Sequence, residues 1–379
     1  MKDIRFWSIV NGDSLDSLDN IADFLHNGFS QKGADRIWSK EYFDWKLGDQ
    51  NPAGKGYLSY ATSDDKIVGV ATLTRKKALY NGQELIVAEI GDTYTLPDII
   101  RKGKPLVLSD LDSNPKSYVN KSVFGRIVSE ITNRASLDGV SIIYGTPNKN
   151  SFPGYIKRLG FLNHTQYNNI TNYRPSFQLL IKKHSLLKPL SKFFYAVESI
   201  EFKLQKMLYS FWYGKGVKVS IRMPKPDEID ALWKATKPKT GFSLVRDGQY
   251  WLYRFANHPL ANYKFINFRK NGSLIAMVVV REFSYREGRR VASIVEWMLK
   301  DNISIGYLIS EALNLINSRE VDYYYFYSSA AGSISTIAKG NLFLHKNPTP
   351  IIFAKNDLSE EICKNNNSFE FHLGSSDAA

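Results

Sequence analysis

The sequence contains few of the residues on which several common kinds of site depend. Its one cysteine, Cys363, excludes an internal disulfide and a multi-thiolate metal site. The longest apolar run, Leu274 to Val280, is far shorter than the roughly 20 residues that cross a bilayer. The first residues include Lys2, Asp3 and Arg5, where a secretory signal would need an apolar core. We therefore expect a cytoplasmic protein without a membrane-spanning helix.

Sequence motifs for metal and nucleophile chemistry are also missing. The 6 histidines are far apart in the chain, and none belongs to a His-Glu-x-x-His pattern. The chain has no Gly-x-Ser-x-Gly elbow and no Gly-x-x-x-x-Gly-Lys-Ser/Thr loop. We therefore expect no metal ion, and nothing favours a serine hydrolase or a P-loop nucleotide enzyme.

Bulky apolar and aromatic residues are abundant. The 379 residues are 43% hydrophobic and include 22 Tyr and 22 Phe, which excludes a disordered chain. At about 100–200 residues per domain, this length predicts two or three domains. The 50 Lys and Arg outnumber the 37 Asp and Glu, so an anionic partner is expected. Because the basic residues are scattered rather than gathered in one stripe, nucleic acid is not favoured as that partner.

A pattern in the first half of the chain recurs in the second half. Tyr42 to Trp45 corresponds to Tyr250 to Tyr253, and residues 88–92 correspond to 292–296. The offset between equivalent residues changes only from 208 (250 − 42) to 204 (292 − 88), so length differences fall in turns. Such a repeat of a whole supersecondary pattern predicts two related domains.

Each copy reads as an aromatic-rich helix, then strands joined by a glycine hairpin at 80–82 or 286–288. An amphipathic helix follows at about 121–135 or 304–318, and then a buried strand at 140–145 or 321–328. A short helix ends the first copy at Gly160, which suits a helix C-cap. This order predicts a mixed α/β fold, of α+β type with a mixed sheet.

The segment between the copies, 176–216, predicts an amphipathic helix. Apolar residues recur every three or four positions from Leu186 to Phe211, and several lysines accompany them. One interpretation is a membrane-surface helix at 186–211, which would make peripheral membrane contact. The other, which we favour because Glu198 and Glu201 put both charge signs on the helix, is a linker packed on both domains. The residues 357–379 read as a poorly ordered tail.

Several motifs, each of moderate specificity, follow one another in the order seen in a known family. They are Ile90 to Asp98, then Tyr118 to Arg126, then Tyr144 to Asn148, and finally Pro153 to Phe161. Together they resemble the GNAT superfamily of acyl-CoA-dependent N-acyltransferases, in a tandem arrangement. The resemblance implies a catalytic, acyl-CoA-binding domain at 1–175, the linker at 176–216, and a degenerate second domain at 217–356.

The resemblance also implies a site for acetyl-CoA or another acyl-CoA. In such folds the fourth and fifth strands part, and the pantetheine arm pairs with the exposed backbone of the fourth strand. That strand would run from about 85 to 96 here, which brings Thr93, Tyr94 and Thr95 beside the thioester. Asn148 resembles the residue that bonds the pantetheine arm, although it could simply close a turn.

Two segments compete for the pyrophosphate. Residues 101–105 keep a glycine at the usual spacing, whereas residues 119–124 open the amphipathic helix directly. Because free N–H groups and the helix dipole at a helix N-terminus bind anions, we prefer the second segment. Its expected contacts are Asn120, Lys121, Ser122, Val123 and Phe124. On its own, Ser122 would be read as an ordinary N-terminal helix residue and Lys121 as a solvated charge.

The amine must lose a proton as it attacks the thioester, so a carboxylate near the fourth strand is expected. Asp92 is the first candidate and Glu89 the second, because a carboxylate in an apolar strand is costly to bury without a partner. The alternative is a strand-end carboxylate that caps a turn or pairs with an arginine. The resemblance gives Tyr155 the role of protonating the thiolate, and a packed aromatic is the alternative.

The second copy lacks a comparable phosphate loop, so we expect it to have lost coenzyme binding and to shape the acceptor pocket. The expected substrate-binding residues there are Trp251, Arg254, Glu296 and Trp297, with Tyr253 and His258 nearby. All of them could equally be core residues.

The sequence therefore predicts an N-acyltransferase that moves an acyl group, in the first instance acetyl, from coenzyme A to a primary amine. A nucleotide-linked amino sugar used in surface polysaccharide biosynthesis is the expected acceptor. Two alternatives remain open. One is an aminoacyl-tRNA-dependent transferase that builds peptidoglycan bridges, and the other is a non-catalytic binding or scaffold protein with two degenerate domains.

Overall fold

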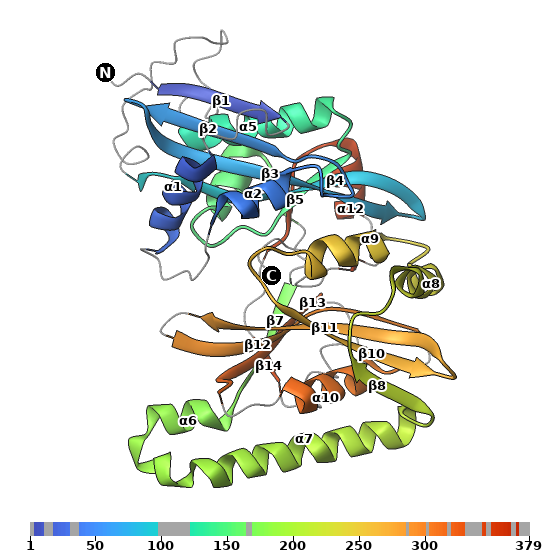
Figure 1. Ribbon diagram of the computed structural model, residues 1–379. Coiled ribbons are helices and arrows are strands. Elements are labelled where there is room, and N and C mark those ends of the chain that lie inside the picture. Colours follow the sequence, from blue (N-terminus) through green and yellow to red (C-terminus); the bar gives the residue numbers. More distant parts are fainter. Residues whose placement is uncertain are drawn as a thin grey trace.

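The computed structural model describes most of the chain (Figure 1). The described residues are 4–10, 18–30, 38–97, 122–163, 169–285, 288–300, 303–316, 320–329, 343–345, 350–364 and 369–370. They form two mixed sheets, stacked one above the other in Figure 1 with helices between them and outside them. The mixed α/β fold with two tandem units that the repeat predicted is therefore confirmed.

The first sheet is built mainly from the first copy. Its main path runs through β1 (Ile4–Val10), β2 (Tyr57–Ser63), β3 (Lys66–Tyr80), β4 (Gln83–Thr95), β5 (Ile142–Gly145), β15 (Ile352–Phe353) and β6 (Leu162–Asn163). Off this path, β9 (Phe242–Leu244) pairs with β3, and β16 (Phe369–Glu370) pairs with β9. Most neighbours are antiparallel, but β4 and β5 are parallel.

The second sheet repeats the order of the first. Its path runs through β8 (Val217–Ile221), β10 (Tyr263–Lys270), β11 (Ser273–Tyr285), β12 (Arg289–Leu299), β13 (Tyr323–Ser329), β7 (Asn169–Pro175) and β14 (Leu344–His345). Here β12 and β13 form the parallel pair, as β4 and β5 do in the first sheet. The duplication read from the sequence is thus visible strand by strand.

Strands cross between the two copies. β7, from the end of the first copy, lies between β13 and β14 of the second sheet. In return β15, from the end of the second copy, lies between β5 and β6 of the first sheet. β9 and β16 also come from the second half of the chain and belong to the first sheet. Neither sheet is therefore built from one copy alone.

Helices cover both faces of each sheet. The first sheet carries α1 (Leu18–Ser30) and α2 (Lys40–Leu47) on one face and α5 (Val123–Leu137) on the other, where the π-helical turn η2 (Gly154–Arg158) also packs. The second sheet carries α8 (Pro226–Thr236), α9 (Gly248–Trp251) and η5 (Leu252–Ala256) on the side of the first domain (Figure 1). Its opposite face carries α10 (Ile305–Ile316).

The copies meet through equivalent residues. The Trp45 indole Nε1 donates to the Tyr253 carbonyl at 3.0 Å, and the Tyr253 hydroxyl donates to the Trp45 carbonyl at 3.1 Å. The two rings stack with centroids 4.9 Å apart. Because Trp45 and Tyr253 occupy the same position in the repeat, the contact is reciprocal, like the contact between two subunits across a two-fold axis.

Local turn chemistry is as the sequence predicts at two places. Asn81 and Gly82 both have positive φ, 50° and 81°, which is the tight hairpin expected of an Asn-Gly pair. Gly160 has a φ of 71° and follows the last helical turn of the first copy, as expected of a C-cap.

Two expectations about the connecting segments are wrong. The segment after 356 includes the helix α12 (Asp357–Lys364), whose Ile362 is buried in the core of the first domain. The linker forms α6 (Phe177–Lys183), the 3₁₀ helix η4 (Ser185–Leu190) and the long α7 (Ser191–Tyr213). However, the apolar face of α7 does not pack on the two domains, because residues such as Phe193, Leu204 and Phe211 are exposed. Within the described ranges, no helix is both apolar and long enough to pass through a membrane.

Candidate active site

The candidate site lies where β4 and β5 part. Their parallel pairing runs from Val87↔Ile142 to Ile90↔Gly145, where β5 ends. β4 continues to Thr95 and stays paired with β3 on its other side. In the described residues, no strand pairs with this last part of β4 on the side of β5. An extended ligand that added a strand to the sheet would pair with β4 on this side.

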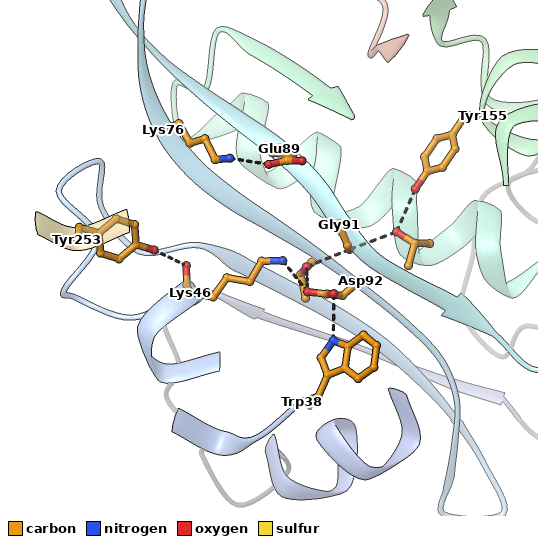
Figure 2. A network of polar contacts seen from close by, with 10 residues as sticks. Trp38, Lys46, Lys76, Glu89, Gly91, Asp92, Tyr155 and Tyr253 are labelled. Carbon is orange, nitrogen blue, oxygen red and sulfur yellow. Dashed lines mark hydrogen bonds and ion pairs between the residues drawn. The ribbon is translucent and has the colours of Figure 1, made fainter. Parts of the chain in front are cut away.

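A β-bulge in β4 at this point changes the side of the sheet that the following side chains face. The β3–β4 register shifts between Val70↔Tyr94 and Thr72↔Gly91, and Asp92 has a φ of 45°. A bulge inserts one residue, so the alternation of faces changes there. As a result Glu89 and Asp92 face the side of α2, whereas Thr93 faces the side of α5 (Figure 2).

Tyr155 stands over the parted strands from η2. Its hydroxyl donates to Thr93 Oγ1 at 3.0 Å, and the side chain is almost fully buried between Phe124 and Phe161. Burial raises the pKa of the Tyr155 phenol well above its ordinary value, although the Thr93 hydroxyl opposes the shift. The phenol therefore keeps its proton throughout the neutral range. Nearby, the Thr95 hydroxyl is buried without a hydrogen-bond partner in the described residues.

The first turn of α5 borders the same region. The Ser122 side chain caps it by accepting from Gly125 N at 2.8 Å, and Val123 is buried. An added Cβ at Gly69 would lie 2.6 Å from Val123 Cγ1, so this glycine lets the helix approach β3 closely. The N–H groups of Val123 and Phe124 have no partner within the helix and point toward its N-terminus. Asn120, Lys121 and the competing segment 101–105 lie outside the described residues.

Asp92 is held in a buried ion pair. Its Oδ2 lies 2.5 Å from Lys46 Nζ of α2, and the two side chains are 1% and 0% exposed. Its Oδ1 accepts from Trp38 Nε1 at 3.0 Å (Figure 2). An added Cβ at Gly91 would lie 3.2 Å from the Lys46 ammonium, so the glycine leaves room for it. The carboxylate thus has a buried countercharge.

Glu89 is in a second buried ion pair. Its Oε2 lies 2.5 Å from Lys76 Nζ of β3, and both side chains are almost fully buried. Lys76 also lies over the Tyr144 ring, 5.9 Å from its centroid. Neither of the two expected bases is therefore an isolated carboxylate.

Other expected contacts have evident structural roles. Asn148 Oδ1 accepts from the backbone N–H groups of Asn150 and Ser151, so it closes the turn before η2. The Tyr94 ring packs against Phe24 and Phe29 of α1, on the opposite side of β4 from Tyr155. For Tyr94, the backbone remains a candidate for coenzyme contact and the side chain does not.

The second copy has a bulge close to the equivalent position, but its gap is filled. In the β11–β12 register, Val279 faces Glu296 and Val280 faces Ile294, so the inserted residue is Val295, which corresponds to Gly91. The counterparts of Thr93 and Gly145 are Trp297 and Phe326, both buried, with ring centroids 6.1 Å apart. The rings of Trp297 and Phe326 therefore occupy the place where the first copy has the Thr93 side chain and the hydrogen atom of Gly145.

The expected substrate residues of the second copy are all buried, and the structure does not bring them to one surface. Trp251 and Trp297 belong to core clusters on opposite faces of the second sheet. Glu296 accepts from the Tyr250 hydroxyl at 3.2 Å and lies 3.4 Å from Arg246 Nε. Arg254 is buried beside the Trp45 ring of the first copy, with its Cζ 5.6 Å from the centroid.

Sequence reasoning missed the partners Lys46, Trp38 and Lys76. A signal for the first was present, because Lys46 corresponds to Arg254 at the same offset of 208 (254 − 46) that relates Tyr42 to Tyr250. A basic residue at the same position of two aromatic-rich helices is a candidate for a buried countercharge.

Comparison with known proteins shows similarity at the level of structure. No family model matches the sequence, and no curated protein matches it by sequence. An N-myristoyltransferase from Saccharomyces cerevisiae with bound myristoyl-CoA superimposes with a TM-score of 0.58 at 13% identity, over 93% of this chain and 78% of that one. A GCN5-related N-acetyltransferase from Anabaena variabilis does so with 0.57 at 11%, over 92% and 72%. Another such protein, from Kribbella flavida, gives 0.51 at 12%, over 93% and 71%.

This chain therefore shares its fold with these N-acetyltransferase and N-myristoyltransferase structures over more than nine-tenths of its length.

Proposed function

We propose that the protein is an acyl-CoA-dependent N-acyltransferase whose reaction takes place in the first domain. The observation that carries the proposal is the open side of β4 from Gly91 to Thr95, with the Tyr155 hydroxyl beside it. The second domain has the same strands but fills the equivalent gap with Trp297 and Phe326. The similar solved structures include one with bound myristoyl-CoA, which supports the class of donor.

The donor would bind in two parts. The amide groups of a pantetheine arm match the spacing of backbone N–H and C=O groups along the open side of β4. The pyrophosphate would lie at the N-terminus of α5, where the N–H groups of Val123 and Phe124 and the positive end of the helix dipole favour an anion. The buried hydroxyl of Thr95 offers a further hydrogen bond in the same region.

In the reaction, the amine nitrogen attacks the thioester carbon, a C–N bond forms, and the C–S bond breaks. The nitrogen loses a proton and the sulfur leaves as a thiolate that needs one. Tyr155 can supply a hydrogen bond or a proton to that sulfur, because its raised pKa keeps the phenol protonated. Thr93 holds the phenol in place until then.

The base remains a proposal with two candidates, Asp92 and Glu89. Protonation of either would leave a buried lysine without its countercharge, which is unfavourable. We propose that Asp92 acts chiefly as a positioning residue. Anchored by Lys46 and Trp38, it stabilises the bulge that turns Thr93 toward Tyr155.

The acceptor would be a primary amine. Among the described residues, no group specific to a nucleotide or a sugar faces the open side of β4, so a nucleotide-linked amino sugar stays a prediction from the sequence. The second domain would contribute to the acceptor site through the contact around Trp45 and Tyr253.

Calorimetric titration with acetyl-CoA and myristoyl-CoA tests the proposal. We expect the protein to bind one of them, and Thr93→Trp, which copies the second domain, to weaken that binding at least tenfold. The matched control is the exposed Thr240→Trp, which should bind as the native protein does. Absence of binding to both donors, or unchanged binding by Thr93→Trp, would overturn the proposal and favour a scaffold or an aminoacyl-tRNA-dependent enzyme.

A further inference from the structure

The helix α7 presents its apolar side to solvent. At about 100° of rotation per residue, its exposed apolar residues fall within an arc of about 100°. We call this arc the apolar face of α7, and it consists of Phe193, Val197, Ile200, Leu204, Met207, Leu208 and Phe211. Their exposure ranges from 38% at Val197 to 77% at Phe211. In Figure 1 the helix runs along the outer edge of the second domain, far from the first sheet.

The opposite side of α7, which packs on the protein, carries ionisable groups beside the Phe202 and Tyr209 rings. Glu201 pairs with Arg174 at 2.6 Å, and Lys206 pairs with Glu311 of α10 at 3.0 Å. Phe202 is the one large apolar side chain of α7 that is buried in the described structure. A surface helix of a water-soluble domain normally has the reverse arrangement, with apolar residues inward and charges outward. The arrangement indicates that something apolar covers the outer side.

The charges around this face have one sign. Lys188, Lys192, Lys203 and Lys215 are exposed along or beside the helix. The acids of the same segment are not available to balance them, because Glu198 is buried and Glu201 is paired with Arg174. An apolar strip flanked by lysines complements a surface with an anionic layer above hydrocarbon.

Aromatic residues end the helix. Phe211, Trp212 and Tyr213 are 77%, 75% and 41% exposed. Tryptophan and tyrosine are enriched at the interface between lipid headgroups and acyl chains, where an apolar ring and a polar tip are both accommodated. At about 100° per residue, Phe211 lies on the apolar face of α7 and Trp212 at its edge, where a helix lying flat would place both rings at the interface. Tyr213 lies on the other side of the helix.

We propose that the apolar face of α7 binds the surface of a membrane rich in anionic lipid, with the helix parallel to the bilayer. A second copy of the chain fits less well, because two such faces in contact would bring their rows of lysines together. The interaction needs neither coenzyme nor acceptor, so it is independent of the proposed function.

Vesicle flotation of the full-length chain tests this proposal. We expect the protein to float with vesicles of phosphatidylcholine and phosphatidylglycerol, to remain behind with phosphatidylcholine alone, and to be released by high salt. The variant Ile200→Ser/Leu204→Ser/Leu208→Ser should lose binding while its circular dichroism spectrum is unchanged. The control Leu137→Ser, at an 84% exposed leucine of α5, should bind normally.

A variant with two lysines replaced measures the electrostatic contribution to membrane binding. Because a lysine near an anionic surface contributes on the order of fivefold to partitioning, Lys192→Gln/Lys203→Gln should bind roughly 25-fold more weakly. The proposal is overturned if the native chain fails to float with anionic vesicles, or if the triple variant floats as well as the native chain. It is also overturned if the native chain is a lipid-free dimer that the triple variant converts to a monomer.

Discussion

At the scale of single residues, the bulge at Asp92 determines the chemistry of the site. Without it, strict alternation would place Asp92 and Glu89 on opposite faces of β4. With it, both carboxylates face the lysines on one side, and Thr93 faces Tyr155 on the other. The position of one inserted residue therefore decides which side chains face the proposed thioester site.

We predict that Tyr155→Phe lowers kcat by about 10²–10⁴-fold, the range typical of a lost general acid, with little change in KM. Because the native phenol has a raised pKa, the native rate should not fall between pH 7 and 9 through its ionisation. Steady-state kinetics at several pH values measure both effects. A Tyr155→Phe enzyme with native kcat would show that the ring is only a packed aromatic.

For Asp92 the prediction concerns its ion pair with Lys46. Asp92→Asn and Lys46→Met should each destabilise the protein by about 3–5 kcal/mol, because each leaves one buried charge without its partner. The double variant should be less destabilised than the sum of the two, which denaturant titration can measure.

The same variants separate a positioning role from a base. If Asp92 positions Thr93, the double variant recovers part of kcat and the pH–rate profile keeps its shape. If Asp92 is the base, kcat stays low in the double variant and the limb of the profile that reports its ionisation disappears.

At the scale of elements, α7 is joined to the second domain by ionisable groups. Burial raises the pKa of Glu198 from its ordinary value of 4.5 to about 7, and the charge of Glu201 adds to the increase. Arg174 and the backbone N–H of Phe177 act in the opposite direction without cancelling it. The carboxyl of Glu198 is therefore protonated in the folded protein over a range where the unfolded chain has already lost the proton.

This difference predicts how stability depends on pH. Glu198 contributes most to the free energy of unfolding when the pH is below the pKa of its carboxyl in the unfolded chain. This contribution, on the order of 3 kcal/mol in total, is lost as the pH rises toward the pKa of the same carboxyl in the folded protein, near 7. Glu198→Gln should therefore be more stable than the native protein at pH 8 and about equal to it at pH 5. Urea titrations at both pH values test this, and an equal difference between the two proteins at both would contradict it.

At the scale of the whole molecule, the exchange of β7 and β15 makes the two domains dependent on each other. Each sheet needs a strand from the other copy, and the reciprocal Trp45–Tyr253 contact joins the helices between them. We expect a single cooperative unfolding transition, because neither sheet is complete within its own half of the chain.

Fragments test that expectation. Residues 1–215 and 216–379, expressed separately, should each lack a strand and fail to show a sharp thermal transition. Refolded together, they should form a one-to-one complex with the circular dichroism spectrum of the intact chain. A fragment 1–215 that melts cooperatively by itself would contradict the prediction.

The duplication, the mixed α/β class, the order of the long strands and the hairpin at Asn81 and Gly82 are all readable in the sequence. Each depends on residues close together in the chain: a turn pair, an apolar period, a repeated order of motifs. The proposed donor type and the proposed roles of Thr93 and Tyr155 come from a resemblance to a known family, and the structure places these two side chains in contact.

Only the tertiary structure decided the rest. The partner of Asp92 is 46 residues away in sequence, and the strand that completes the first sheet is more than 200 residues from its neighbour β5. A bulge cannot be located from alternation alone when the strand is buried on both sides, as β4 is from Val87 to Ile90. Whether an apolar helical face turns inward or outward depends on what else is available to pack, and the side of α7 that faces the second domain carries Phe202 together with two ion pairs.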